Sequence, residues 1–293
     1  MSRHSLSVPV AAAVGGGFAL LLAFSAGSHG RSEAAIGSQD FDAKASICRG
    51  LGERLGRSGN LLVLARELVP TPRAGVQVAD AAGGSVEVED NLDLYEKLGL
   101  MEGHLMIGKA LLDADLQGDA LPHFGHPVRE LYDYLKPVFA ARDYPEFERE
   151  LGDLERRAKE APRAAATTAA YDDVLGRING LRRTIPQSLL GSPRFVLRGI
   201  ALMLDNAADD LAESLSRGRI ANTVEYHDAM GFARYADGAA RQAGELLGPK
   251  LAAVRKETAL ALGAFPSLKP PGTPVRGVND LHAAADRVKA LAD

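Results

Sequence analysis

Imidazole and carboxylate side chains lie close together near the middle of this chain of 293 residues. His123, His126 and Glu130 follow one another at spacings of three and four, which place side chains on one face of a helix. Nitrogen and oxygen ligands of this kind bind zinc, copper(II) or iron. The pattern H-x2-H-x3-E therefore predicts a transition-metal site, although it is less specific than an HExxH or a paired CxxC motif.

A further histidine, His104, is the fourth candidate ligand. It lies four residues after Leu100 and three before Ile107, and so belongs to an apolar stripe of a helix. Such a histidine could complete the metal site. It could equally be a core histidine that hydrogen bonds to a neighbour, and the sequence leaves both interpretations open.

Two prolines affect whether these side chains converge. Pro122 and Pro127 both suit the first turn of a helix. If a helix starts at Pro127, both histidines of the motif lie before it and only Glu130 lies within it. The alternative to a metal site is therefore a solvated helix start with two incidental histidines.

The stretch that carries the first of these histidines is predicted to be a long helix with two adjacent apolar stripes. Asn91 is the predicted N-cap, and Gly118 is the predicted stop. Gly99, Gly103 and Gly108 lie inside it, and each costs about 1 kcal/mol relative to alanine. Close approach of a neighbouring helix is the usual reason for such glycines, so we expect this to be the central helix of a bundle.

Composition predicts the fold class. Hydrophobic residues make up 46% of the chain, aromatic residues only 5%, and there is no tryptophan. Alanine and leucine dominate, while β-branched residues are sparse, which favours closely packed helices. We therefore predict an all-α, multi-helix bundle of about eight helices. The alternating valines of residues 73–90 are the exception and predict either a small β-hairpin or an irregular loop.

The predicted domain organisation begins with an export signal. Residues 1–27 combine Arg3 with an apolar run from Val8 to Ala26, which is typical of a signal peptide cleaved before Ser28. The alternative is an uncleaved anchor in the inner membrane, because this run nearly reaches spanning length.

The rest of the chain is divided by composition. A flexible tether is predicted at 28–42, a helical bundle domain at 43–263, and a proline-rich strap with a C-terminal helix at 264–293. Within the bundle, Ser192 followed by Pro193 predicts the start of another long helix.

Two regions about 100 residues apart share a layout, PHFGHPVRELYDYL and TVEYHDAMGFARYA. The comparison gives His126 and Asp228 like positions. If it reflects a duplication, the bundle has two pseudo-repeated helical halves. The second candidate ligand set would then be Glu225, His227 and Asp228. Chance similarity between amphipathic hairpins is the alternative, and His227 by itself is interpreted as a surface capping residue.

Charge and motifs exclude several classes of function. The chain has 34 basic and 38 acidic side chains, and its net charge of −4 is no footprint for nucleic acid. The single cysteine, Cys48, excludes an intramolecular disulfide and a cysteine-based metal site. No GxSxG, GxxxxGK[ST], HExxH or CxxCH motif occurs. Adjacent carboxylates such as Asp209 and Asp210 are interpreted as part of a solvent-facing helix surface.

Together these observations predict an exported ligand-binding protein without enzyme activity, located in the periplasm or secreted. Its predicted ligand is a transition metal such as zinc, copper or iron, held by His104, His123, His126 and Glu130. The alternative is a structural or protein-interaction module of the cell envelope, which binds an envelope protein and no metal.

Overall fold

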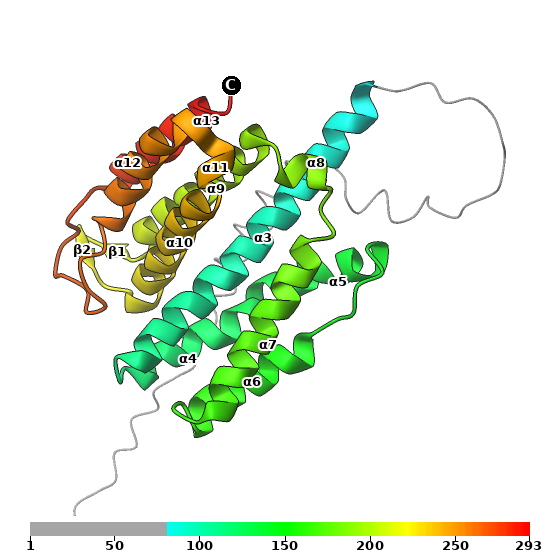
Figure 1. Cartoon of the computed structure of the whole chain (residues 1–293). Coiled ribbons are helices and arrows are strands. Elements are labelled where there is room, and N and C mark those ends of the chain that lie inside the picture. The colour runs from blue at the N-terminus through cyan, green and yellow to red at the C-terminus, as the bar shows by residue number, and fades with distance from the viewer. Residues whose placement is uncertain (1–80) are drawn as a thin grey trace, which may run out of the picture. The chain divides into compact units, whose positions relative to one another are not determined.

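Helix α3, Ala81–Asp113, is the central element of the part of the chain that this computed structural model describes, residues 81–293, with side chains from residue 88. Figure 1 shows α3 passing between two groups of helices. Leu98, Met101 and Leu105 on α3 are completely buried, because both apolar stripes have partners. The expectation of a central helix is confirmed.

The first group of helices follows α3 directly and covers one side of it (Figure 1). Its elements are α4 (Gln117–His126), the π-helical turn η1 (Pro127–Leu131), α5 (Tyr132–Ala141), α6 (Glu148–Glu160) and α7 (Ala165–Arg182).

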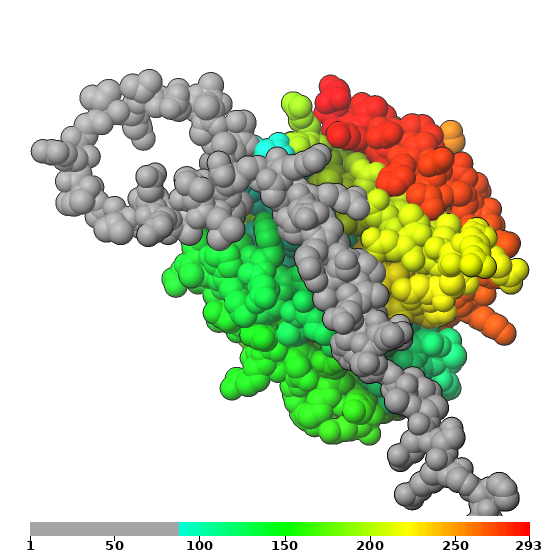
Figure 2. Space-filling model, turned by 180° about the vertical axis from the view of Figure 1, so that it is seen from behind, coloured from blue at the N-terminus to red at the C-terminus, as the bar shows by residue number. Residues whose placement is uncertain are grey.

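The second group covers the other side of α3 (Figure 1). Its longer helices are α9 (Pro193–Glu213), α10 (Thr223–Gln242), α12 (Leu251–Leu262) and α13 (Val278–Ala290). Its short elements are α8 (Gln187–Leu190), β1 (Leu215–Ser216), β2 (Arg219–Ile220), α11 (Gly244–Leu247) and η2 (Gly248–Lys250). From behind, the orange and red surface of α12 and α13 lies on the opposite flank to the green surface of the first group (Figure 2).

The all-α class is confirmed, since residues 81–293 contain nine α-helices of ten or more residues and one two-stranded sheet. The predicted start of α9 is also confirmed. The Ser192 side chain accepts a hydrogen bond from the backbone N–H of Phe195, which satisfies one of the unpaired donors at the helix start. Among the described residues, no helix is both long enough and apolar enough to cross a membrane.

The glycines of α3 mark where helices meet, as expected. The backbones of α3 and α10 touch at Gly103 and Gly231. A Cβ added to Gly231 would lie 2.4 Å from the Gly103 carbonyl oxygen, which is far inside van der Waals contact. Only glycine at this crossing allows the two helices to come so close.

Three boundary predictions were wrong. Residues 81–90 form the first turns of α3 and do not belong to a hairpin at 73–90; the small hairpin of this fold is β1–β2. Helix α3 therefore begins before Asn91. Gly118 does not stop a helix, because α3 ends at Asp113 and Gly118 lies in the first turn of α4.

Several predictions fall outside the described residues. These are the signal peptide at 1–27, the tether at 28–42 and the first part of the predicted bundle domain, residues 43–80. The predicted strap lies within the described residues and has no regular secondary structure from Ala264 to Val275.

Candidate metal centre

Three imidazoles and one carboxylate converge where helices α3, α4 and α10 meet. His104 comes from α3, His123 and His126 come from α4, and Asp228 comes from α10. One ligating atom from each lies within 4.8 Å of the others. All four residues are between 0% and 4% exposed, so the cluster belongs to the interior of the bundle. Buried polar groups of this kind require partners, and here they are partners for one another.

The carboxylate of Asp228 is the centre of the cluster. Its Oδ1 lies 2.6 Å from His104 Nδ1 and 2.7 Å from His123 Nδ1. Without a metal ion, each of these nitrogens donates its hydrogen to Oδ1. His126 Nδ1 lies 3.1 Å from the second oxygen, Oδ2, but lacks hydrogen-bond geometry and has no hydrogen-bond partner. His126 Nδ1 therefore retains unused bonding capacity.

The close crossing of α3 and α10 positions two of the four residues. Gly103 directly precedes His104 in the chain, and Gly231 lies one turn after Asp228. Because the helices touch at these glycines, the imidazole and the carboxylate can meet between them. The Phe232 ring packs edge-on against His104 at a centroid distance of 4.9 Å and limits its rotation.

The two histidines of α4 are positioned by a single helical turn. They are three residues apart, so both rings face α10, and their centroids are 5.7 Å apart. Pro122 lies inside α4, and the widened turn η1 begins at Pro127. Pro127 has no N–H to donate to the carbonyl of His123, which is consistent with the change in helix type at this point.

Glu130, the fourth predicted ligand, lies on η1 at the edge of the cluster. Its carboxylate oxygens are 3.7 Å from His104 Nε2 and 3.7 Å from His126 Nδ1. Its side chain is 36% exposed. The structure thus brings the three predicted histidines together and leaves Glu130 just outside the group, beside two of them.

Asp228 is the carboxylate that converges with the three histidines, whereas the sequence motif predicted Glu130 in this role. It was predicted only as part of a second ligand set that depended on an internal repeat. That comparison gave His126 and Asp228 like positions, and their side chains in fact face each other. Equivalent positions in a repeat predict no contact, and only the fold shows that the two segments meet.

A second group of carboxylates adjoins the first. Asp210 on α9, Glu225 on α10 and Asp228 have oxygens within 4.8 Å of one another, so Asp228 belongs to both groups. Asp210 was interpreted as solvent-facing, which is wrong, because it is half-buried and turned toward these acids. Glu225 and Asp228 are three residues apart and therefore share one face of α10.

Electrostatics differ between the two groups. Burial raises the pKa of Asp228, but the adjacent His104 and His123 outweigh this and hold its pKa well below the usual range. Burial, and then the charge of Asp228, raise the pKa of Asp210 well above its usual range. The same two causes raise the pKa of Glu225 to about 7. The histidine side thus stabilises a carboxylate anion, whereas on the acidic side neighbouring carboxylates oppose ionisation, an effect that His126 offsets only in part at Glu225.

His227 is buried beside the cluster, so its interpretation as a surface cap was wrong. Its Nε2 donates a hydrogen bond to the carbonyl oxygen of Leu268 at 2.7 Å, and Asn222 is the N-cap of α10. Burial lowers the pKa of His227. Leu268 belongs to the predicted strap, which therefore contacts the bundle next to the imidazoles.

The residues fit a metal ion. A tetrahedral zinc site with metal–ligand bonds of 2.0–2.1 Å has ligand-to-ligand separations of about 3.3 Å. The three nitrogen-to-oxygen distances around Asp228 run from 2.6 to 3.1 Å. Small outward side-chain movements would open the cluster to this size. The unpartnered atoms His126 Nδ1 and His123 Nε2 are also consistent with a donor set that has capacity for an ion.

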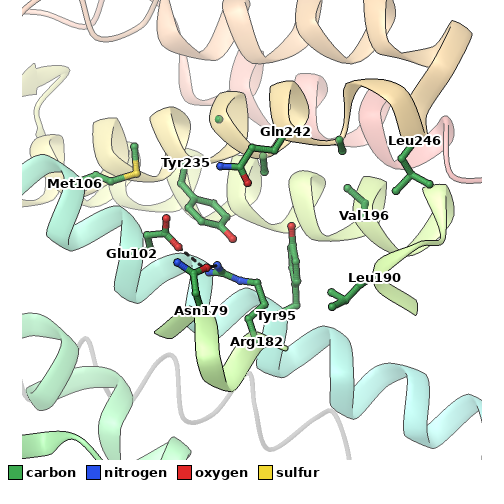
Figure 3. Close-up of a pocket in the computed structure, with 13 residues that line it drawn as sticks. Tyr95, Glu102, Met106, Asn179, Arg182, Leu190, Val196, Tyr235, Gln242 and Leu246 are labelled. Carbon is green, nitrogen blue, oxygen red and sulfur yellow. Dashed lines mark hydrogen bonds and ion pairs between the residues drawn. The ribbon is translucent and has the colours of Figure 1, made fainter. Parts of the chain in front are cut away.

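A pocket of about 380 Å³ lies elsewhere on α3 (Figure 3). In Figure 3, the guanidinium of Arg182 points toward Glu102, and the rings of Tyr95 and Tyr235 flank it. None of the predicted metal ligands lines this pocket. It is a separate polar region of the bundle.

Comparison of the chain with known protein families, with curated proteins and with solved structures finds no match.

Proposed function

We propose that this protein binds a transition-metal ion through His104, His123, His126 and Asp228. The observation that carries the proposal is the convergence of these four donors in the interior, with His126 Nδ1 buried and unpartnered. A cluster that served only to fill the core would have no need of three imidazoles around one acid. Three nitrogen donors and one oxygen donor suit zinc, copper(II) or iron.

We further propose that the protein holds the ion without acting as an enzyme. Four protein donors fill the positions of a tetrahedral ion, whereas a catalytic zinc site keeps one position for water or substrate. The very low exposure of all four residues supports a closed site. Export to the periplasm or beyond remains part of the proposal and is supported by the composition of residues 1–27.

The test is native mass spectrometry of the tag-free protein titrated with Zn²⁺, Cu²⁺ and Fe²⁺. We expect one ion to bind tightly in the buried cluster. His123→Ala and His126→Ala should each lower its affinity by at least about tenfold. Circular dichroism should show unchanged helicity in both variants, because each removes a side chain and no backbone contact.

His282→Ala is the matched control. His282 lies on α13, where its Nδ1 is 3.0 Å from Asp205, far from the cluster in the chain and on another helix. This variant should bind the ion as the wild type does. If all three histidine variants bind equally, the residue assignment is wrong. If the wild type binds no ion tightly, the protein is better described as an interaction module of the cell envelope.

A further inference from the structure

The carboxylate of Asp228 has two oxygens in different surroundings. Oδ1 lies within 2.7 Å of His104 Nδ1 and His123 Nδ1. Oδ2 has no contact that short with these two rings, and its imidazole neighbour is His126 Nδ1 at 3.1 Å. A carboxylate in this position can donate one oxygen to an ion in the histidine group and the other to an ion beside it.

Beside it lie Asp210 and Glu225, whose oxygens are within 4.8 Å of each other and of Asp228. An acidic group alone does not make a site, since carboxylates can also share protons. Here a second observation points to a ligand. His126 Nδ1 is buried and has no hydrogen-bond partner, and it lies 3.1 Å from Asp228 Oδ2 and 3.7 Å from Glu130 Oε1.

Charge balance favours two cations over one. The two groups contain three carboxylates, at Asp210, Glu225 and Asp228, and Glu130 adjoins them as a fourth. Within residues 81–293, no lysine or arginine forms an ion pair with any of them. With neutral imidazoles and ionised carboxylates, one divalent ion leaves a charge of −2 in this part of the bundle. Two divalent ions neutralise it, which lowers the cost of keeping these charges out of bulk water.

We propose that the protein holds a dinuclear metal centre, in which Asp210 and Glu225 bind a second divalent cation and Asp228 bridges the two ions. This proposal rests on the proposed function, because it requires the ion in the histidine group. Ions in two-metal protein sites are typically about 3.5–4 Å apart, a separation that a single bridging carboxylate spans.

The two positions differ in the cation that they favour. Imidazole-rich ligation suits zinc, copper(II) or iron, whereas carboxylate ligation suits harder ions such as manganese(II). Asp210 and Glu225 are half-buried, and the imidazoles are buried. The second ion therefore lies on the more accessible side of the centre. Glu130 lies beside His104 and His126 of the histidine group.

The experiment is a titration of the full, tag-free chain with Mn²⁺, followed by native mass spectrometry and electron paramagnetic resonance. The wild type should bind two ions, and its spectrum should show exchange coupling between them. Asp210→Asn and Glu225→Gln should each retain the first ion and weaken the second by about 100-fold. Their spectra should then show an isolated Mn²⁺ ion.

Asp209→Asn is the matched control, since it removes the same charge one position earlier on α9. Asp209 Oδ1 lies 3.7 Å from His282 on α13, in a different direction from the acidic group. This variant should keep both ions and their coupling. Because Gln is isosteric with Glu, Glu225→Gln also provides a test should Asp210→Asn fail to fold.

The outcomes separate the two proposals. One ion in the wild type, unaffected by Asp210→Asn, overturns the dinuclear centre and leaves the proposed function standing. No ion in the wild type, with Mn²⁺ here or with Zn²⁺, Cu²⁺ and Fe²⁺ in the earlier titration, overturns both. Two ions without exchange coupling contradict the bridging role of Asp228, and two ions retained in both acidic variants contradict the assignment of Asp210 and Glu225.

Discussion

Two buried polar regions share helices α3 and α10 but differ in which groups balance the charge of their buried carboxylates. In the pocket of Figure 3, Glu102 pairs with Arg182 at 2.8 Å. The guanidinium also lies 5.9 and 5.7 Å from the ring centres of Tyr95 and Tyr235. One permanent positive charge meets one carboxylate, so this region is neutral with the chain's own residues.

The cluster proposed to bind metal has no such permanent partner among residues 81–293. Asp228 meets imidazole rings and no guanidinium or ammonium group, and two further acids adjoin it. The negative charge of these carboxylates must therefore be balanced by protons or by cations from solution. The comparison teaches that a buried carboxylate indicates a ligand site only when the chain itself supplies no fixed counter-charge.

The largest effect is expected when the shared carboxylate is removed from the metal centre. Asp228→Asn preserves size but removes the anion that both groups use, so metal affinity should fall by about 1,000-fold or more. Thermal unfolding with and without Zn²⁺ checks this, because bound metal stabilises the folded state. A melting temperature that still rises with Zn²⁺ as in the wild type would contradict the central role of Asp228.

The next effect concerns the helix crossing that both regions depend on. Gly231→Ala places a Cβ 2.4 Å from the Gly103 carbonyl, and backbone cannot yield as a side chain does. We expect a loss of about 3 kcal/mol in the free energy of unfolding, measured with urea. Gly238→Ala on the same helix is the control, since its Cβ meets no atom within 4 Å. It should leave stability unchanged or raise it by up to about 1 kcal/mol.

A smaller effect is expected in the neutral region. Arg182→Met leaves Glu102 without its counter-charge, and both side chains are more than four-fifths buried. The free energy of unfolding should fall by about 2 kcal/mol. Metal affinity should not change, because the pocket and the metal centre are separate. A parallel loss of metal binding would show that the two regions are coupled through α3.

The smallest effect is a pH dependence of the metal-free protein. The pKa of Glu225 is raised in the folded state from 4.5 to about 7. Between these values the folded protein binds this proton more tightly than the unfolded chain, so the stability that protonated Glu225 contributes is fully present below pH 4.5 and is lost as pH rises through about 7. Asp228, Glu130 and Glu213 oppose ionisation of Glu225, and His126 favours it.

The measurement is urea unfolding with a chelator at pH 5 and pH 8. The fall in stability should be about 1 kcal/mol smaller in Glu225→Gln than in the wild type, because partial exposure screens the repulsion. An equal fall in both proteins would remove Glu225 as its source. Excess Zn²⁺ should reverse the trend, since metal binding is favoured by ionised ligands.

Local pattern was enough to predict much of the fold. The apolar stripes of α3 depend only on helical periodicity, and the pair Ser192–Pro193 predicted the start of α9 because capping involves neighbouring residues. The start of α3 was missed because the alternating valines of residues 76–88 favour a strand, whereas the chain is helical from residue 81 onward.

The sequence by itself determined the helical class, the central helix and the three histidines of the cluster, because residue type and periodicity are local properties. Only the tertiary structure decided that Asp228, more than a hundred residues beyond His123, is their partner and that Asp210 faces it. That choice depends on the contact of Gly103 with Gly231, which brings α3 and α10 together. No periodicity encodes such a contact, because it exists only when two distant helices pack.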